Sequence, residues 1–220
     1  GASGSKKWVS CLAERPKDKP FFMWFASHDA HRSFWDKELE ETYDEKTMVP
    51  SPFMVNDKNT RMDLAGYFNE VTRFDYNVGE VIRELDRQNV LDNTIVIVMA
   101  DNGRDFPRAK TLLLEDGIVT PFVVFYPAGM KKKNAVCTSL LSSIDIAPTL
   151  MEIAGVDSIP DTFQGRSFTA LLENPDKKFR NFAFAEHNWH VYEAYERMVC
   201  TEEYILIENK RPNLPGRGTV

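Results

Sequence analysis

Apolar residues recur at three- and four-residue steps from about Arg61 to Gln88, the longest regular pattern in the chain. The stripe includes Leu64, Val71 and Leu85, and the charged residues of this stretch lie mostly off it. This period is typical of an amphipathic α-helix that buries one face. The sequence therefore predicts one long helix here.

Three short apolar runs have the length of strands and show no polar alternation: residues 20–27, 94–100 and 121–126. Runs of this kind are typical of strands that are covered on both faces. The stretch between residues 28 and 60 is polar and irregular, which is typical of a loop that is either functional or disordered.

Shorter helices are predicted at residues 6–15, 145–154 and 167–173, and Gly155 suits the left-handed residue that ends the second of them. Buried strands that alternate with helices predict an α/β fold, with a mostly parallel sheet flanked by helices.

The pattern changes after Arg180, where short strands joined by turns predict an antiparallel unit. We therefore expect residues 1–180 to form part of one α/β domain and residues 181–220 to begin a small antiparallel subdomain. The chain starts without Met and stops in a Pro/Gly-rich stretch, so we expect a fragment of a longer protein.

Composition narrows the class of protein. Of 220 residues, 43% are hydrophobic and 27% charged, which predicts a folded core. The net charge of −6 argues against a general nucleic-acid binder. No apolar run approaches the roughly 20 residues of a membrane span. The three cysteines fit neither a disulfide framework nor a zinc site.

Candidate chemistry follows two of the predicted strands, where ligands gather in α/β folds. Asp101 and Asn102 offer adjacent oxygen atoms that suit Ca²⁺ or Mg²⁺, although Asp-Asn-Gly is also ordinary turn chemistry. His28 and His31 form a pair that fits metal binding, acid–base work or hydrogen bonding within a loop.

Three cations, Arg104, Arg108 and Lys110, follow Asp101 closely. They fit either a site for an anionic substrate or a solvated surface. A second histidine pair, His187 and His190, fits either a substrate wall or a packed turn.

The run Asp101–Thr111, followed by Asp116–Val124, resembles the metal-site segment of the sulfatase family. Three further segments resemble that family in the same order: residues 20–32, 142–155 and 164–168. The resemblance covers about residues 6–209, and its nearest subgroup in appearance is the heparan N-sulfatase-like sulfatases.

This resemblance implies an alkaline-phosphatase-like fold and hydrolysis of a sulfate ester or sulfamate on a sulfated sugar. It implies one Ca²⁺ held by Asp101 and Asn102 with two acidic residues near the N-terminus of such proteins. Lys110 is implied to contact the sulfate group, and His28 to contact the sulfate or to assist the leaving group. Export, to the periplasm, a lysosome or the medium, is also implied. The weaker candidates for binding an anionic glycan are Arg104, Arg108, His187 and His190.

The family's nucleophile is a formylglycine made from Cys or Ser in a C/S-x-P-x-R motif. The run Cys11–Arg15 has Ala13 where that motif has Pro, and it reads as part of a helix. We therefore expect the nucleophile and about half of the calcium ligands to lie outside this chain, which alone would be inactive. Two alternatives stay open: a phosphatase or phosphodiesterase of the same superfamily, and a non-catalytic fragment that binds sulfated glycans.

Overall fold

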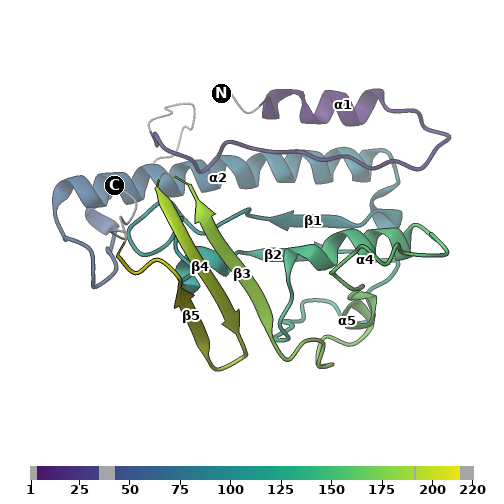
Figure 1. Cartoon of the computed structure of the whole chain (residues 1–220). Coiled ribbons are helices and arrows are strands. Elements are labelled where there is room, and N and C mark those ends of the chain that lie inside the picture. The colour runs from purple at the N-terminus through teal and green to yellow at the C-terminus, as the bar shows by residue number, and fades with distance from the viewer. Residues whose placement is uncertain (1–3, 35–42, 191, 214–220) are drawn as a thin grey trace. The chain divides into compact units, whose positions relative to one another are not determined.

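The computed structural model describes residues 4–34, 43–190 and 192–213. The chain divides into two compact units, Gly1–Thr94 and Ile95–Val220, and each is described by itself (Figure 1). No helix in the described ranges is long and apolar enough to cross a membrane. The subdomain boundary expected near residue 180 stays a prediction.

The first unit is helical, and its longest element is α2, Lys58–Arg87. Asp57 caps α2 by accepting a hydrogen bond from the Thr60 amide at 2.8 Å, which satisfies one of the amides left unpaired at a helix start. Leu64, Val81 and Leu85 are buried along the predicted stripe, so the long helix is confirmed. The other elements are η1 (Ser5–Lys7), α1 (Trp8–Glu14), η2 (Glu45–Thr47) and η3 (Leu91–Asn93).

The first predicted strand, residues 20–27, forms neither a helix nor a strand of any sheet among the described residues. Its side chains alternate between half-buried and exposed positions. Phe25 stacks on Trp8 of α1 with ring centroids 5.4 Å apart, whereas Trp24 is 80% exposed. The expectation that both faces are covered is therefore wrong for this chain, because its contacts, such as that of Phe25 with Trp8, cover only one of them.

In the second unit, β1 (Val96–Met99) and β2 (Phe122–Phe125) confirm the other two predicted strands. They pair antiparallel, with Val96 opposite Phe125 and Met99 opposite Phe122. A mostly parallel sheet was expected, whereas this pair of strands runs antiparallel. A parallel pair needs a crossover, usually through a long helix, and the connection here holds only the short α3, Glu115–Ile118.

Two helices cover one face of β2. They are α4 (Ile146–Ile153), preceded by η4 (Ser143–Asp145), and α5 (Thr169–Glu173). Phe168, Leu171 and Leu172 form the buried cluster against which Phe122 and Val124 pack. Both predicted helices are thus confirmed, and Gly155 has the positive φ of 76° expected at the end of α4.

A three-stranded antiparallel sheet ends the described chain (Figure 1). Its strands are β3 (Ala183–Trp189), β4 (Glu193–Cys200) and β5 (Ile205–Asn209), in that spatial order. The register sets Ala185 opposite Met198 and Met198 opposite Ile207. Met198 is buried, and the predicted antiparallel strands after residue 180 are confirmed.

Candidate functional site

The loop that follows β1 is folded tightly by two glycines. The amide of Gly103 donates to the carbonyl of Gly117 at 2.9 Å. A Cβ on Gly103 would overlap the carbonyl oxygen of Asp116, and a Cβ on Gly117 would overlap that of Leu112. Only glycine permits this approach of two backbone segments. The loop is thereby closed into one compact structure, called here the 101–118 loop.

Three apolar side chains of the 101–118 loop are buried and form its base. Phe106, Ala109 and Leu113 are buried beneath it at 2%, 0% and 6% exposure. The amide of Lys110 donates to the carbonyl of Arg104 at 3.1 Å, which fixes the two ends of the cationic stretch relative to each other. The base and this bond hold the candidate side chains of the loop in a defined arrangement.

Asp101 and Asn102 lie at the start of the loop, directly beyond the end of β1. The Asn102 side-chain amide nitrogen donates to the Gly103 carbonyl at 2.7 Å, which leaves its oxygen as the atom that can ligate a cation. A carboxylate and an amide oxygen fit Ca²⁺, which takes about six to eight oxygen ligands. Among the described residues no cluster of three or more acidic, histidine or cysteine side chains completes such a shell.

The three predicted cations differ in their surroundings. Arg104 pairs with Asp116 at 3.3 Å on the surface. Lys110 lies 4.0 Å from Asp105, and the two side chains are only 11% and 14% exposed. Arg108 is exposed and has a positive φ of 67°. Sequence reasoning missed Asp105, the acidic partner that keeps the Lys110 ammonium in place.

The loop that contains His28 belongs to the first unit. His28 is exposed, and its carbonyl accepts a hydrogen bond from the His31 amide at 2.8 Å. Asp29 is nearly buried and accepts from the guanidinium of Arg73, with Arg73 Nε at 3.1 Å from Asp29 Oδ2. This contact ties the loop to α2, and sequence reasoning did not identify it.

The two histidines of the second pair, His187 and His190, differ in their exposure to solvent. His187 is 7% exposed, and its Nδ1 lies 3.4 Å from Glu196 of the facing strand. Its Nε2 is buried and has no hydrogen-bond partner among the described residues. His190 is exposed just beyond a register shift in β3. A role of either residue in glycan binding stays a prediction.

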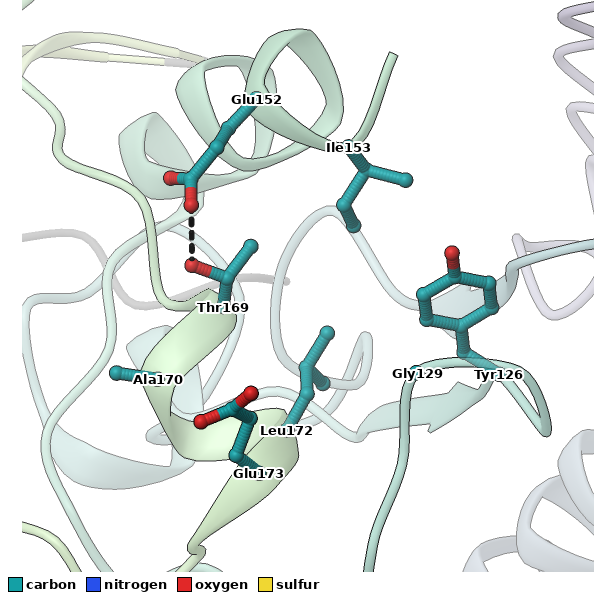
Figure 2. A pocket seen from close by; sticks show the side chains of 8 residues that line it. All are labelled: Tyr126, Gly129, Glu152, Ile153, Thr169, Ala170, Leu172 and Glu173. Atoms are coloured by element: carbon teal, nitrogen blue, oxygen red, sulfur yellow. Dashed lines mark hydrogen bonds between the residues drawn. The ribbon is translucent and has the colours of Figure 1, made fainter. Parts of the chain in front are cut away.

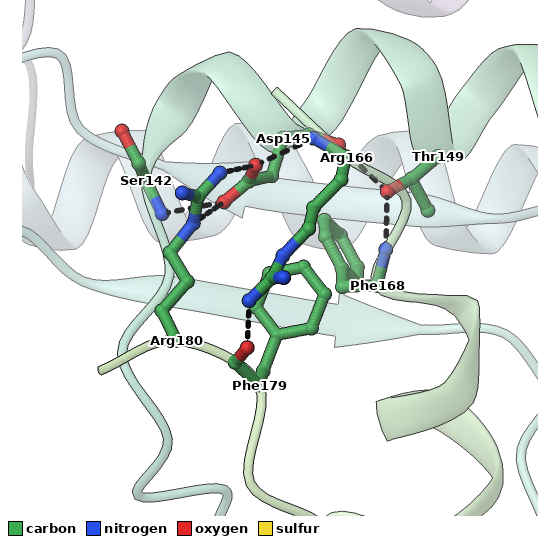
Figure 3. A network of polar contacts seen from close by, with 7 residues as sticks. All are labelled: Ser142, Asp145, Thr149, Arg166, Phe168, Phe179 and Arg180. Atoms are coloured by element: carbon green, nitrogen blue, oxygen red, sulfur yellow. Dashed lines mark hydrogen bonds and ion pairs between the residues drawn. The ribbon is translucent and has the colours of Figure 1, made fainter. Parts of the chain in front are cut away.

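One buried carboxylate organises the segment that leads to β3 (Figure 3). Asp145 is fully buried and accepts from Arg180 Nε at 2.8 Å and from the amides of Arg166 at 2.9 Å and Ser142 at 3.0 Å. Burial by itself raises the pKa of Asp145, but these hydrogen bonds outweigh it and hold the pKa below its usual value. The hydrogen bond that Arg180 donates to Asp145 raises the pKa of the Arg180 guanidinium in turn.

A cavity of about 370 Å³ lies between α4, α5 and the end of β2 (Figure 2). Its walls include Tyr126, Leu172 and the carboxylates of Glu152 and Glu173. Glu152 accepts a hydrogen bond from the Thr169 hydroxyl at 2.8 Å. None of the predicted site residues lines this cavity, and its acidic walls repel sulfate, so it is distinct from the predicted site.

Comparison with known proteins identifies the family of the chain. A family model described as Sulfatase matches residues 5–156, and one described as N-sulphoglucosamine sulphohydrolase, C-terminal, matches residues 108–212. The chain therefore belongs to the sulfatase family.

Individual relatives support the same family. The chain is 31% identical to human N-sulphoglucosamine sulphohydrolase over 96% of its length, which is 48% of that protein. It is 28% identical to an ulvan-active sulfatase of Formosa agariphila over 77% of its length, 28% of that protein. The chain thus spans half or less of the length of these two relatives.

A solved structure from work on glycosaminoglycan metabolism by Bacteroides thetaiotaomicron matches 96% of this chain and 52% of its own. The TM-score is 0.75 at 22% sequence identity. Likeness at this identity speaks for the fold, and it confirms the alkaline-phosphatase-like α/β class.

Proposed function

We propose that the complete polypeptide hydrolyses a sulfate ester or sulfamate on a sulfated sugar. The observation that carries this proposal is the 101–118 loop. It combines an Asp–Asn pair suited to a hard cation with a nearly buried lysine, inside one rigid structure. Two relatives, N-sulphoglucosamine sulphohydrolase and N-acetylglucosamine-6-O-sulfatase, are named for sulfated amino sugars, which supports a sulfated glycan as substrate.

Asp101 and Asn102 hold one Ca²⁺ in this proposal, through a carboxylate oxygen and the amide oxygen. A bound divalent cation supplies Lewis-acid polarisation of sulfate oxygens. The hydrogen bond between Gly103 and Gly117 fixes the backbone next to these two ligands. The remaining calcium ligands are proposed to come from outside this chain.

Lys110 binds the sulfate group in this proposal. Its side chain is 11% exposed, and a charge in a water-poor site interacts more strongly with an anion than one in bulk water. Asp105 lies 4.0 Å away, so it attracts the ammonium without a close contact that would occupy its protons. Arg104 and Arg108 extend the positive charge along the loop toward an anionic glycan.

His28 contacts the sulfate or gives a proton to the leaving oxygen of the sugar. An imidazole suits this task because its ordinary pKa lies near neutral pH. The Asp29–Arg73 contact next to it fixes the loop on α2. His187 and His190 are proposed as weaker contributors to glycan binding.

The nucleophile, a formylglycine, is proposed to lie outside this chain. Cys11 sits inside α1, and its run has Ala13 in place of the motif's proline, which supports that assignment. The chain by itself is therefore expected to be inactive. Export of the complete polypeptide, which the resemblance implies, is part of the same proposal.

The test is turnover of an aryl sulfate and of sulfated amino sugars by the complete polypeptide. Lys110→Ala is expected to lower kcat/KM roughly 100-fold or more, since one preplaced donor to a developing anion is worth that much. Lys178→Ala, an exposed lysine outside the loop, is the matched control and is expected to act like the unaltered protein. Faster turnover of aryl phosphate than of aryl sulfate would favour a phosphatase, and salt-sensitive glycan binding without turnover would favour a binding module.

A further inference from the structure

Four residues of α2 form a stripe along the helix, called here the 63–73 stripe. Asp63, Gly66, Glu70 and Arg73 follow one another at steps of three and four positions, which places them on one face of an α-helix. The stripe is about 15 Å long at the rise of an α-helix. Residues 28–34, called here the His28 loop, contact both its ends and its middle.

Both ends of the stripe bind the His28 loop by charge. The Arg73 guanidinium binds both carboxylate oxygens of Asp29, with Nε at 3.1 Å from Oδ2. The Arg32 guanidinium lies 2.7 Å from the Asp63 carboxylate. The side chains of Asp29 and Arg73 are 6% and 15% exposed, against 26% and 38% for Asp63 and Arg32. The Asp29–Arg73 pair is therefore the stronger attachment, because a buried charge is costly to leave without its partner.

The middle of the stripe admits the backbone of the loop. Phe34 is buried, and a Cβ on Gly66 would lie 2.5 Å from the Phe34 carbonyl oxygen. That distance is too short for any side chain, so only glycine allows this contact. The loop is thus held against α2 at three points along the stripe.

His28 begins a turn that this attachment holds. The His31 amide donates to the His28 carbonyl at 2.8 Å, and Asp29 is the second residue of the turn. Since Asp29 is the direct neighbour of His28, its bond to Arg73 restricts the backbone from which the imidazole projects. The His28 residue itself is exposed, so the turn presents an accessible imidazole on a restrained backbone.

We infer that Arg73 is a positioning residue for His28 and that it acts by holding Asp29. The inference rests on the proposed function and takes His28 as the proton donor to the leaving oxygen of the sugar. In that step the bond from sulfur to this oxygen breaks, the oxygen keeps the electron pair and takes the proton of the His28 imidazolium, and the sulfur bonds to the nucleophile. The imidazole must lie within hydrogen-bond reach of the oxygen, and a displacement of about 1 Å can cost roughly 100-fold in rate.

Arg73→Lys in the complete polypeptide tests the inference, because lysine keeps the charge but loses the planar fork that binds two carboxylate oxygens. The readout is kcat/KM for a sulfated amino sugar and for nitrophenyl sulfate, whose leaving oxygen departs without a proton. The ratio of the sugar value to the nitrophenyl value is expected to fall roughly 10-fold or more, since only the sugar needs the positioned acid. A loss of folded protein lowers both values equally and leaves the ratio unchanged. Arg83→Lys, in the exposed pair with Glu80 on the same helix, is the matched control and should leave both values unchanged.

Gly66→Ala displaces the same loop without altering a charge. Its Cβ meets the backbone of Phe34, although alanine favours the helix itself. The ratio is expected to fall roughly fivefold or more, whereas Gly79→Ala, whose Cβ meets only the flexible end of Arg83, should keep it. A ratio that falls in Gly66→Ala but not in Arg73→Lys would assign the positioning to packing alone and would overturn the inference, as would an unchanged ratio in both.

Hydrogen–deuterium exchange of the complete polypeptide separates this inference from the proposed function. The His31 amide is expected to exchange roughly 10-fold faster in Arg73→Lys than in the unaltered protein or in Arg83→Lys, because its protection is lost when the turn opens. If the unaltered protein turns over neither substrate, the proposed function fails and the role of Arg73 in proton transfer fails with it. If the unaltered protein turns over both substrates, and Arg73→Lys changes neither the ratio nor the His31 exchange, only the inference fails.

Discussion

Arg73 on α2 binds the carboxylate of Asp29 with two of its nitrogens, Nε at 3.1 Å and a terminal nitrogen. The two side chains are 15% and 6% exposed, so the pair is largely removed from water. Arg73 also lies 3.7 Å from Glu70, one turn earlier on the helix. The loop that follows residues 21–27 and contains His28 is therefore attached to the long helix by charge as well as by packing.

Breaking this attachment is predicted to destabilise the first unit. Arg73→Met leaves the Asp29 carboxylate buried without its main partner, which costs about 3 kcal/mol in the free energy of unfolding. Denaturant unfolding of the complete polypeptide measures this. The control is Arg83→Met, which removes an exposed pair with Glu80 on the same helix and should cost under about 1 kcal/mol. If both variants lose the same free energy of unfolding, the contact of Arg73 with Asp29 stabilises the protein no more than an exposed ion pair does.

Acid is predicted to weaken the second unit through Asp145. Its pKa is lower in the folded state than in the unfolded state, so its contribution to stability is present above the ordinary pKa of aspartate. That contribution is lost as the pH falls through the lowered folded pKa. The Tm, measured from pH 7 downward, is expected to drop steeply once the pH passes below about 4.

The variant Asp145→Asn separates this effect from general acid unfolding. It is expected to lower the Tm at pH 7, because Arg180 loses its charged partner, and to flatten the fall in Tm at acid pH. The exposed Asp161→Asn is the control and should keep the steep fall. If the Tm of Asp145→Asn falls as steeply at acid pH as that of the unaltered protein, Asp145 is not the source of the acid sensitivity.

The glycine contact in the 101–118 loop is predicted to be intolerant of a methyl group. Gly103→Ala forces the backbone away from the Asp116 carbonyl and should cost about 2 kcal/mol, with a loss of turnover of at least tenfold. Gly79→Ala, within α2, is the matched control, because its Cβ would meet only the flexible end of Arg83 at 3.4 Å. Alanine there should stabilise the helix by about 0.5–1 kcal/mol. Turnover and thermal unfolding of both variants provide the measurement.

Calcium removal is predicted to abolish turnover by the complete polypeptide, and added Ca²⁺ should restore it. Asp101→Ala removes the one carboxylate of the Asp101–Asn102 pair and should raise the Ca²⁺ concentration needed for half-maximal activity at least tenfold. Titration of activity with Ca²⁺ after treatment with EGTA measures this. Asp161→Ala should titrate like the unaltered protein, and an Asp101→Ala curve that coincides with it would remove Asp101 from the metal site.

Much of the candidate site was visible in the sequence because its residues are neighbours in the chain. Asp101, Asn102 and Lys110 lie on one continuous loop after an apolar strand, so their chemistry could be read directly. Ion pairs between residues distant in the sequence were not found by sequence reasoning. Asp29 and Arg73 are 44 positions apart, and Asp145 and Arg180 are 35 apart. No periodicity or motif relates such residues before the chain has folded.

The sequence by itself determined the long helix, strands β1 and β2, the C-terminal antiparallel strands and the sulfatase resemblance, because periodicity and contiguous motifs express local preferences. Only the tertiary structure decided that β1 and β2 run antiparallel, that one face of residues 21–27 is exposed, and which buried charges are paired. These features depend on contacts between residues distant in sequence, and apolar character alone does not say which surface will cover a strand. The continuous apolar run at residues 20–27 predicted burial on both faces, whereas Phe25 packs on Trp8 of α1 and Phe22 and Trp24 on the other face are exposed.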